Sequence, residues 1–163
     1  MKALGSLVIR ALIIAVAASC IGLGMNLASG RNLPWIYVPP DQIDIKGLKV
    51  PLLNEKEAHR LFDNPDTVFV DTREPDDYAK RHVRGAVLLT PEGMERRFLA
   101  VEPLLPRTSR LILYCYGPEC DMAEKVAEFL VDLEYSNLAI MSAGFPAWRK
   151  AGYHIDQSSK GDE

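Results

Sequence analysis

The sequence has few of the residues on which several classes of protein depend. Its 163 residues carry 19 Lys and Arg against 22 Asp and Glu, a formal net charge of −3, so it has no basic excess to grip a phosphate backbone. This balance argues against nucleic acid as a partner. The chain is also too short for two domains of ordinary size. With three cysteines and three histidines, it offers no grouping that would complete a tetrahedral metal site.

Charge is missing from one long stretch near the N-terminus. Residues 11–30 read ALIIAVAASCIGLGMNLASG, and residues 1–30 hold two basic side chains, Lys2 and Arg10, and no acid. An apolar helix of this length roughly matches a hydrocarbon core ~30 Å thick. Residues 1–30 are therefore predicted to form a transmembrane anchor. A cleaved secretory signal is the alternative, because a positive start before an apolar core is typical of both.

The residues that flank the apolar stretch indicate how the predicted membrane helix is oriented and where the linker begins. Lys2 and Arg10 precede the apolar stretch, and Arg31 is the nearest basic residue after it. Since positive charge gathers on the cytoplasmic side, we expect a single-pass membrane protein whose soluble domain faces the extracytoplasmic (periplasmic) side. Prolines then interrupt the chain, so residues 31–45 are predicted to be a linker.

Beyond the linker, short apolar strands alternate with helices. The runs at 67–70 and 111–114 are typical of strands buried on both faces. The apolar spacing over 122–134 predicts a helix, with Asp121 as its N-cap. Additional elements are expected as strands at 86–89 and 138–141 and as helices at 55–62, 76–81, 93–100 and 145–150. This alternation predicts an α/β fold with a mainly parallel sheet.

Cys115 directly follows the strand expected at 111–114. Functional groups of α/β sheets gather beyond the carboxyl ends of the strands. A cysteine between such a strand and a helix start can be surrounded by backbone N–H groups, which favours the thiolate. Cys115 is therefore the candidate nucleophile, and an inert core cysteine is the alternative. The candidate anion cradle consists of the loop residues Tyr116, Gly117, Pro118, Glu119, Cys120 and Asp121.

Three segments, in this order, resemble the signature motifs of rhodanese-like domains. Residues 70–87 read VDTREPDDYAKRHVRGAV, which is similar to D-x-R…Y…G-H-I-x-G-A. Tyr114-Cys115 then follows an apolar strand, and residues 144–153 resemble the family ending G-G-x-x-x-W…G-Y. We therefore expect a rhodanese-like domain at 46–157 and a polar tail at 158–163.

The resemblance implies a central parallel sheet flanked by helices and a sulfurtransferase activity. Cys115 would carry sulfane sulfur as a persulfide from a small sulfur-containing donor, thiosulfate or another sulfane compound, to a thiol or cyanide-like acceptor. No cofactor and no metal are expected. Asp71 and Arg73 match family positions and are interpreted as pocket or scaffold residues.

The cysteine loop departs from the family pattern in its charges. An Arg often ends this loop in the family and suits an anionic donor, whereas this loop contains Glu119 and Asp121. Two carboxylates near the thiolate disfavour a dianionic donor such as thiosulfate. The missing Arg also argues against the chemistry of Cys-loop phosphatases.

Cys120 lies five positions after Cys115 in the same loop. It could act as a resolving thiol that attacks a persulfide or sulfenic acid on Cys115, form a disulfide with it in an oxidising compartment, or point elsewhere. Two functions follow. The favoured one is a membrane-anchored sulfurtransferase, and the other is a non-catalytic rhodanese-like module that binds sulfur species or responds to redox state through Cys115 and Cys120.

Overall fold

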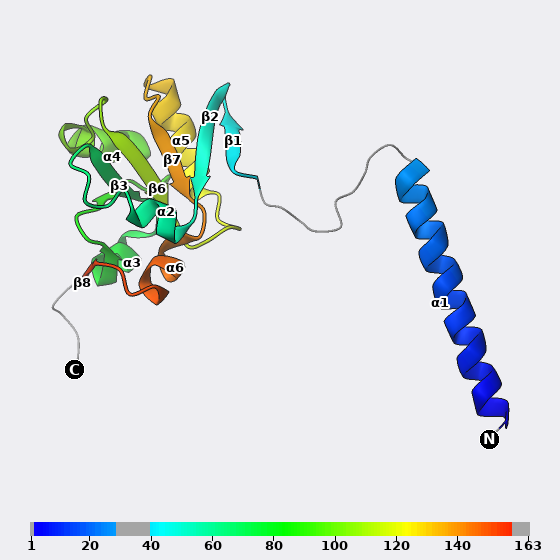
Figure 1. The fold of residues 1–163 in the computed structure, drawn as a ribbon. Helices are drawn as coiled ribbons and strands as arrows, with labels where there is room; N and C mark the ends of the chain where they lie inside the picture. Colours follow the sequence, from blue (N-terminus) through cyan, green and yellow to red (C-terminus); the bar gives the residue numbers. More distant parts are fainter. Residues whose placement is uncertain (1, 29–39, 158–163) are drawn as a thin grey trace, which may run out of the picture. The chain divides into compact units, whose positions relative to one another are not determined.

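The computed structural model describes residues 2–28 and 40–157, which belong to two separate units (Figure 1). The described residues of the first unit form the helix α1 (Lys2–Ala28). Its segment Val8–Met25 is long and apolar enough to cross a membrane, and a signal sequence has the same properties. The part of the expected linker at 31–39 and the expected tail at 158–163 lie outside the described residues.

The second unit is built on a six-stranded sheet with the strand order β1-β2-β7-β6-β3-β5 (Figure 1). Every neighbouring pair in it is parallel except the antiparallel pair β1–β2. Its strands are β1 (Gln42–Ile45), β2 (Leu48–Leu53), β3 (Thr67–Asp71), β5 (Val87–Leu88), β6 (Arg110–Tyr114) and β7 (Leu138–Met141). A separate antiparallel ribbon joins β4 (Arg81–Val83) to β8 (Ile155–Gln157). The predicted α/β class with a mainly parallel sheet is confirmed.

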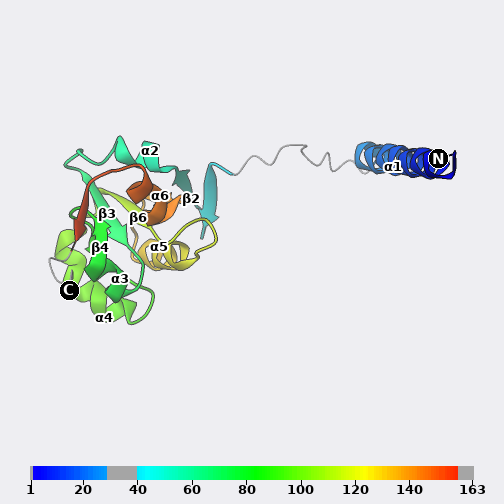
Figure 2. The same cartoon turned by 90° about the horizontal axis from the view of Figure 1, so that it is seen from below.

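Helices cover both faces of this sheet (Figure 2). One face carries α2 (Glu55–His59) and α6 (Gly144–Lys150), and the other carries α4 (Met94–Val101) and α5 (Met122–Asp132). Two shorter elements, α3 (Pro75–Lys80) and the 3-10 turn η1 (Glu102–Leu104), lie in the connections.

The central strand β6 shows why helices pack on both faces of the sheet. Leu111 and Leu113 belong to the core cluster that contains the inner residues of α5, whereas Ile112 and Tyr114 belong to the cluster around Trp148 of α6. All four strand residues are fully buried. Because successive side chains of a strand point to opposite faces, a wholly apolar strand is stable only between two layers of helices.

Several boundaries differ from the expected ones. β1 lies inside the stretch expected to be linker, because Ile45 is buried in the core and the folded unit begins at Pro40. The strand β2 and the ribbon β4–β8 were not expected either. The helix expected at 55–62 ends at His59, although its capping box between Asn54 and Glu57 is present. Asp121 occupies the N-cap position of α5, as expected, but its side chain makes no capping hydrogen bond, and its carboxylate pairs with Lys125 instead.

Candidate active site

Cys115 is the first residue after β6, at the carboxyl edge of the sheet. Because β6 pairs with β3 on one side and β7 on the other, this position is in the interior of the sheet. Cys115 is 3% exposed and belongs to the core cluster on the α5 face. The loop from Cys115 to Asp121, named the cysteine loop below, connects β6 to α5.

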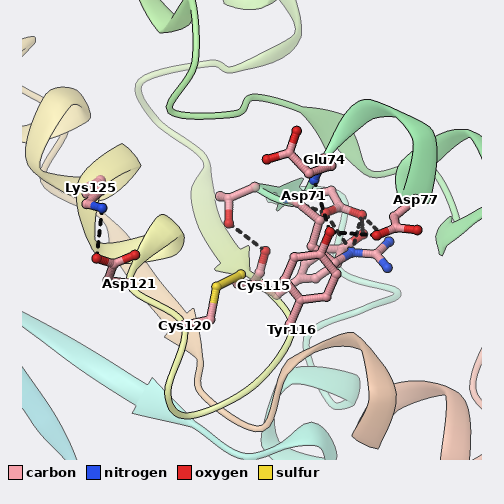
Figure 3. Close-up of a disulfide and its surroundings, with 11 residues drawn as sticks. Asp71, Glu74, Asp77, Cys115, Tyr116, Cys120, Asp121 and Lys125 are labelled. Carbon is pink, nitrogen blue, oxygen red and sulfur yellow. Dashed lines mark hydrogen bonds and ion pairs between the residues drawn. A yellow bond between two sulfur atoms is a disulfide. The ribbon is translucent and has the colours of Figure 1, made fainter.

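Within this loop, Cys115 and Cys120 are joined by a disulfide (Figure 3). Their Cα atoms are 6.3 Å apart, within the usual range for such a bond. Cys120 is half-buried and packs against the same core cluster as Cys115. Of the three arrangements left open by the sequence, the one in which Cys120 points elsewhere is therefore wrong for this state.

The loop between the two cysteines is closed by its own backbone. The Cys120 N–H donates to the Gly117 carbonyl at 3.0 Å, which makes a turn over Pro118 and Glu119. This N–H is directed to a carbonyl and so does not form part of an anion cradle in the disulfide state. Pro118 and Glu119 are exposed at the tip of the turn.

The two loop carboxylates have different surroundings. Asp121 pairs with Lys125 one turn into α5, at 2.8 Å (Figure 3). The hydrogen bond from Lys125 lowers the pKa of the Asp121 carboxyl below its ordinary value. Lys125 therefore offsets much of the charge of Asp121, and the charge at the tip of the loop is that of Glu119.

The turn between β7 and α6 holds the backbone of the cysteine loop. The Phe145 N–H donates to the Cys115 carbonyl at 2.8 Å. Gly144 has φ +70°, and a Cβ on it would lie 2.5 Å from the Gly117 nitrogen and 2.8 Å from the Cys115 oxygen. Glycine alone accommodates both the left-handed backbone and this close approach. The glycine that precedes Phe145 thus contributes directly to the geometry around Cys115.

Asp71 and Arg73 form a buried ion pair at the end of β3. The Arg73 guanidinium donates to Asp71 Oδ2 at 2.6 Å and to Oδ1 at 3.0 Å, and also to the Arg81 carbonyl at 2.7 Å. It lies 4.0 Å from the centre of the Phe145 ring. Burial lowers the pKa of Arg73, but the hydrogen bonds that its guanidinium donates to Asp71 raise the pKa overall, so the guanidinium stays charged. These contacts favour the scaffold interpretation of both residues.

Tyr114 completes this buried network; from the sequence it was noted only as part of the Tyr114-Cys115 motif, with no role at the site. It lies beside Asp71 in the β3–β6 register and donates its hydroxyl to Asp71 Oδ2 at 2.7 Å. The same hydroxyl accepts the Val83 N–H at 3.0 Å. Burial raises the pKa of Tyr114 well above its ordinary value. The sequence contains a signal for this role: a tyrosine ends a strand of buried aliphatic residues, and a buried hydroxyl needs a hydrogen-bond partner.

Tyr116 connects the cysteine loop to α3 (Figure 3). Its hydroxyl donates to Asp77 Oδ2 at 2.6 Å and accepts the Glu74 N–H at 3.4 Å. Burial raises the pKa of Tyr116, and the bond to Asp77 adds to this; the same bond lowers the pKa of Asp77. At neutral pH the phenol is therefore a neutral donor and Asp77 a charged acceptor. Asp77 was also missed, since nothing in its local sequence indicates that it contacts Tyr116.

A cavity of about 720 Å³ lies elsewhere in this unit, along the edge strand β5 and beside α4. Its lining includes Tyr78, Arg84, Arg97 and Asp156, and none of its lining residues belongs to the cysteine loop. Within residues 2–28 and 40–157, no three or more His, Cys, Asp or Glu side chains are grouped closely enough to hold a metal ion. The position of Cys115, rather than a cavity, therefore identifies the candidate site.

Comparison with known proteins identifies the family of this fold. Residues 54–151 match the model of the rhodanese-like domain family. The chain belongs to the rhodanese-like domain family. The rhodanese match includes the cysteine loop, the Asp71–Arg73 pair and Gly144.

Rhodanese-like relatives occur among both sequences and structures. The chain is 35% identical over 89 residues to the thiosulfate sulfurtransferase GlpE of Haemophilus influenzae, covering 55% of this chain and 79% of that protein. The rhodanese-like domain of an Anabaena protein is 18% identical with a TM-score of 0.56, covering 69% of this chain and 85% of that chain. A Bacillus halodurans protein has a TM-score of 0.59 at 19% identity, over 66% and 77% of the two chains. The two structures support the fold, and the sequence relative supports the general class of sulfurtransferases.

Proposed function

We propose that this rhodanese-like protein is a sulfurtransferase that carries sulfane sulfur as a persulfide on Cys115 after its disulfide is reduced. The observation that carries the proposal is the position of Cys115, at the carboxyl end of β6 with its carbonyl held by Phe145. The similarity to a thiosulfate sulfurtransferase supports the class of reaction. The start of α5 after the cysteine loop also favours the thiolate, because helix N-termini attract negative charge.

The reaction has two displacement steps. The Cys115 thiolate attacks the outer sulfur of the donor, the donor's sulfur bond breaks, and the remainder of the donor leaves with the bonding electrons. A nucleophilic acceptor, such as a thiolate or cyanide, then attacks the outer sulfur of the persulfide, and the Cys115 thiolate leaves. No net oxidation occurs, because the sulfane sulfur passes between two nucleophiles.

The loop charges favour a donor with little negative charge. Glu119 is exposed at the tip of the cysteine loop, whereas the charge of Asp121 is offset by Lys125. The Arg73 guanidinium is buried and held by Asp71, so it does not replace the arginine that many family members carry in this loop. A low-molecular-weight persulfide or a monoanionic sulfane compound fits this loop better than dianionic thiosulfate.

The disulfide favours a second candidate function, a redox-responsive rhodanese-like module. In the disulfide state Cys115 has no free thiolate and transfers no sulfur. Reduction would restore the nucleophile, so the loop could report the thiol and disulfide balance of its compartment. This function predicts no persulfide on the reduced protein and a change in a partner's binding instead.

We also propose that α1 anchors the rhodanese-like domain on the extracytoplasmic face of a membrane. The apolar segment Val8–Met25 and the basic residues Lys2 and Arg10 before it support this orientation. An oxidising compartment is also where disulfides persist. An alkaline phosphatase fused after Glu163 should be active in intact cells, because it folds only outside the cytoplasm. Activity of a cytoplasmic reporter at the same position would contradict the orientation.

The persulfide is tested by intact mass on the full chain in detergent. The Cys120→Ser chain, reduced and treated with glutathione persulfide, should gain the mass of one sulfur atom and pass it to cyanide. The Cys115→Ser/Cys120→Ser chain should do neither, while Cys20→Ser/Cys120→Ser should behave like Cys120→Ser, because Cys20 lies in α1. Failure to gain sulfur from several sulfane donors would refute the sulfurtransferase.

A further inference from the structure

Cys120 lies within bonding distance of the sulfur that would carry the persulfide. We propose that the protein has a second activity, the release of hydrogen sulfide from sulfane sulfur, with Cys120 as the resolving thiol and an external dithiol as the reductant. This inference rests on the proposed persulfide at Cys115. It gives the disulfide a place in a catalytic cycle as the product of sulfide release.

The release step is a displacement within the cysteine loop. After a donor has placed sulfane sulfur on Cys115, the Cys120 thiolate attacks the Cys115 Sγ atom. A bond forms between the two protein sulfurs, the bond between Cys115 Sγ and the outer sulfur breaks, and the outer sulfur leaves as HS⁻ with the bonding electrons. The two cysteine sulfurs are oxidised to a disulfide and the sulfane sulfur is reduced to sulfide, so the electrons balance.

The loop backbone holds the two cysteines at the required spacing. The Cys115 carbonyl is held by the Phe145 N–H, and the Cys120 N–H is held by the Gly117 carbonyl. Both hydrogen bonds involve main-chain atoms, which the chemistry at the sulfurs does not consume. Cys120 packs against the same core cluster as Cys115, which places the two cysteines side by side.

Burial makes the internal thiol a strong competitor with external acceptors. Cys115 is 3% exposed, so a bulky acceptor reaches its sulfur with difficulty. An attacking group in the same loop acts at a high effective concentration, because its translational freedom has already been lost. We therefore expect Cys120 to resolve the persulfide before most dissolved thiols do.

The cycle closes when an external dithiol reduces the disulfide. Cys120 is half-buried and Cys115 is buried, so an incoming thiolate reaches the Cys120 Sγ atom more readily. Attack there forms a mixed disulfide on Cys120 and expels Cys115 as the thiolate, which is the form that accepts sulfur again. The second thiol of the reductant then releases Cys120, and the reductant leaves as a disulfide.

A single-turnover experiment on the full chain in detergent tests this inference. The reduced wild-type chain, freed of reductant under anaerobic conditions, receives one equivalent of glutathione persulfide, and sulfide and intact mass are followed over time. We expect one sulfide per chain and a final mass lower than that of the reduced chain by two hydrogen atoms.

The Cys120→Ser chain should keep the added sulfur and release sulfide on the order of 100-fold more slowly, because resolution is no longer intramolecular. Addition of dithiothreitol should make sulfide release catalytic in the wild type.

The outcomes separate this inference from the proposed function. If the wild-type chain keeps the added sulfur for as long as the Cys120→Ser chain, sulfide release by Cys120 is refuted and the persulfide stands. If the wild type forms the disulfide without sulfide, Cys120 responds to oxidation and the inference is also refuted. If Cys120→Ser never gains sulfur while circular dichroism shows that it is folded, the proposed sulfurtransferase itself is refuted. The Cys120→Ala chain serves as a second variant if Cys120→Ser is unstable.

Discussion

Gly144 lies directly against the backbone of Cys115, so that a Cβ on Gly144 would be 2.8 Å from the Cys115 carbonyl oxygen. The next residue, Phe145, donates its N–H to the same carbonyl at 2.8 Å. The turn after β7 therefore shapes the loop after β6, because the two strands are parallel neighbours whose carboxyl ends meet at one edge.

The first prediction is that Gly144→Ala distorts the cysteine loop. The left-handed backbone alone disfavours alanine by about 1–2 kcal/mol, and the contacts with Cys115 and Gly117 force the loop to move as well. We expect the free energy of unfolding to fall by about 3 kcal/mol and persulfide formation to be lost. Denaturant unfolding and intact mass measure the two effects.

Gly152→Ala is the matched control for this change. Gly152 also has positive φ, +75°, but a Cβ there would meet nothing within 4 Å. In the Gly152→Ala chain, the free energy of unfolding should fall by only about 1–2 kcal/mol, which is the cost of a left-handed backbone at alanine, and sulfur transfer should be retained. Equal effects of the two substitutions would show that close approach to the cysteine loop has no role.

The second prediction concerns the buried pair of Asp71 and Arg73. Asp71→Asn leaves the Arg73 guanidinium without its counter-charge at a site where both side chains are at most 5% exposed. Removing one partner of a buried ion pair destabilises proteins by about 3–5 kcal/mol. Chemical denaturation of the variant should show a loss of this size. Asp132→Asn, which breaks the exposed pair with Lys46, should change stability little, and a comparable loss there would contradict the interpretation.

The third prediction is a pH dependence from the bond between Tyr116 and Asp77. The pKa of Asp77 is lowered in the fold, so its contribution to stability is present above the ordinary pKa near 4 and lost as pH falls through the lower folded value. The pKa of Tyr116 is raised, so its contribution is present below about pH 10 and lost as pH rises through the higher folded value. Melting temperatures of wild type and Tyr116→Phe should therefore differ most at neutral pH and converge at both extremes.

A constant difference from pH 3 to pH 11 would show that the phenol acts only by packing. Tyr116→Phe should also lower kcat/KM for sulfur transfer by about tenfold, since the cysteine loop loses its attachment to α3. Lys80→Met serves as the matched control, because it removes the other partner of Asp77 and leaves Tyr116 in place.

The fourth prediction concerns the choice of donor. Glu119→Gln removes the exposed charge at the tip of the cysteine loop and should raise kcat/KM for thiosulfate by about threefold at low salt, with little effect at high salt. A donor without net charge should show no change. Glu128→Gln, an equally conservative change at an exposed position further along α5, should leave both donors unaffected. An equal gain from both substitutions would assign the effect to net charge rather than to the loop.

The sequence alone predicted those elements whose signal is local. The helix α5 follows from apolar residues at helical spacing, and strands β3, β6 and β7 follow from short runs with no exposed face. Their order along the chain, together with the three motif segments at 70–87, 114–115 and 144–153, was sufficient to indicate the family. The strand β1 was missed because four residues that alternate in exposure, between prolines and a turn at Gly47, give too weak a signal.

The order of the elements with strong local signals, the position of Cys115 after β6 and the presence of a second thiol five residues later were thus determined by the sequence itself, because each depends on neighbours along the chain. The tertiary structure alone decided which groups meet at the site. Asp71 contacts Tyr114 because β3 and β6 pair in that register, and Gly144 reaches Cys115 because β6 and β7 end at the same edge. Such contacts depend on the register between separate strands. The packing of the whole core sets this register, and a local sequence pattern does not predict it.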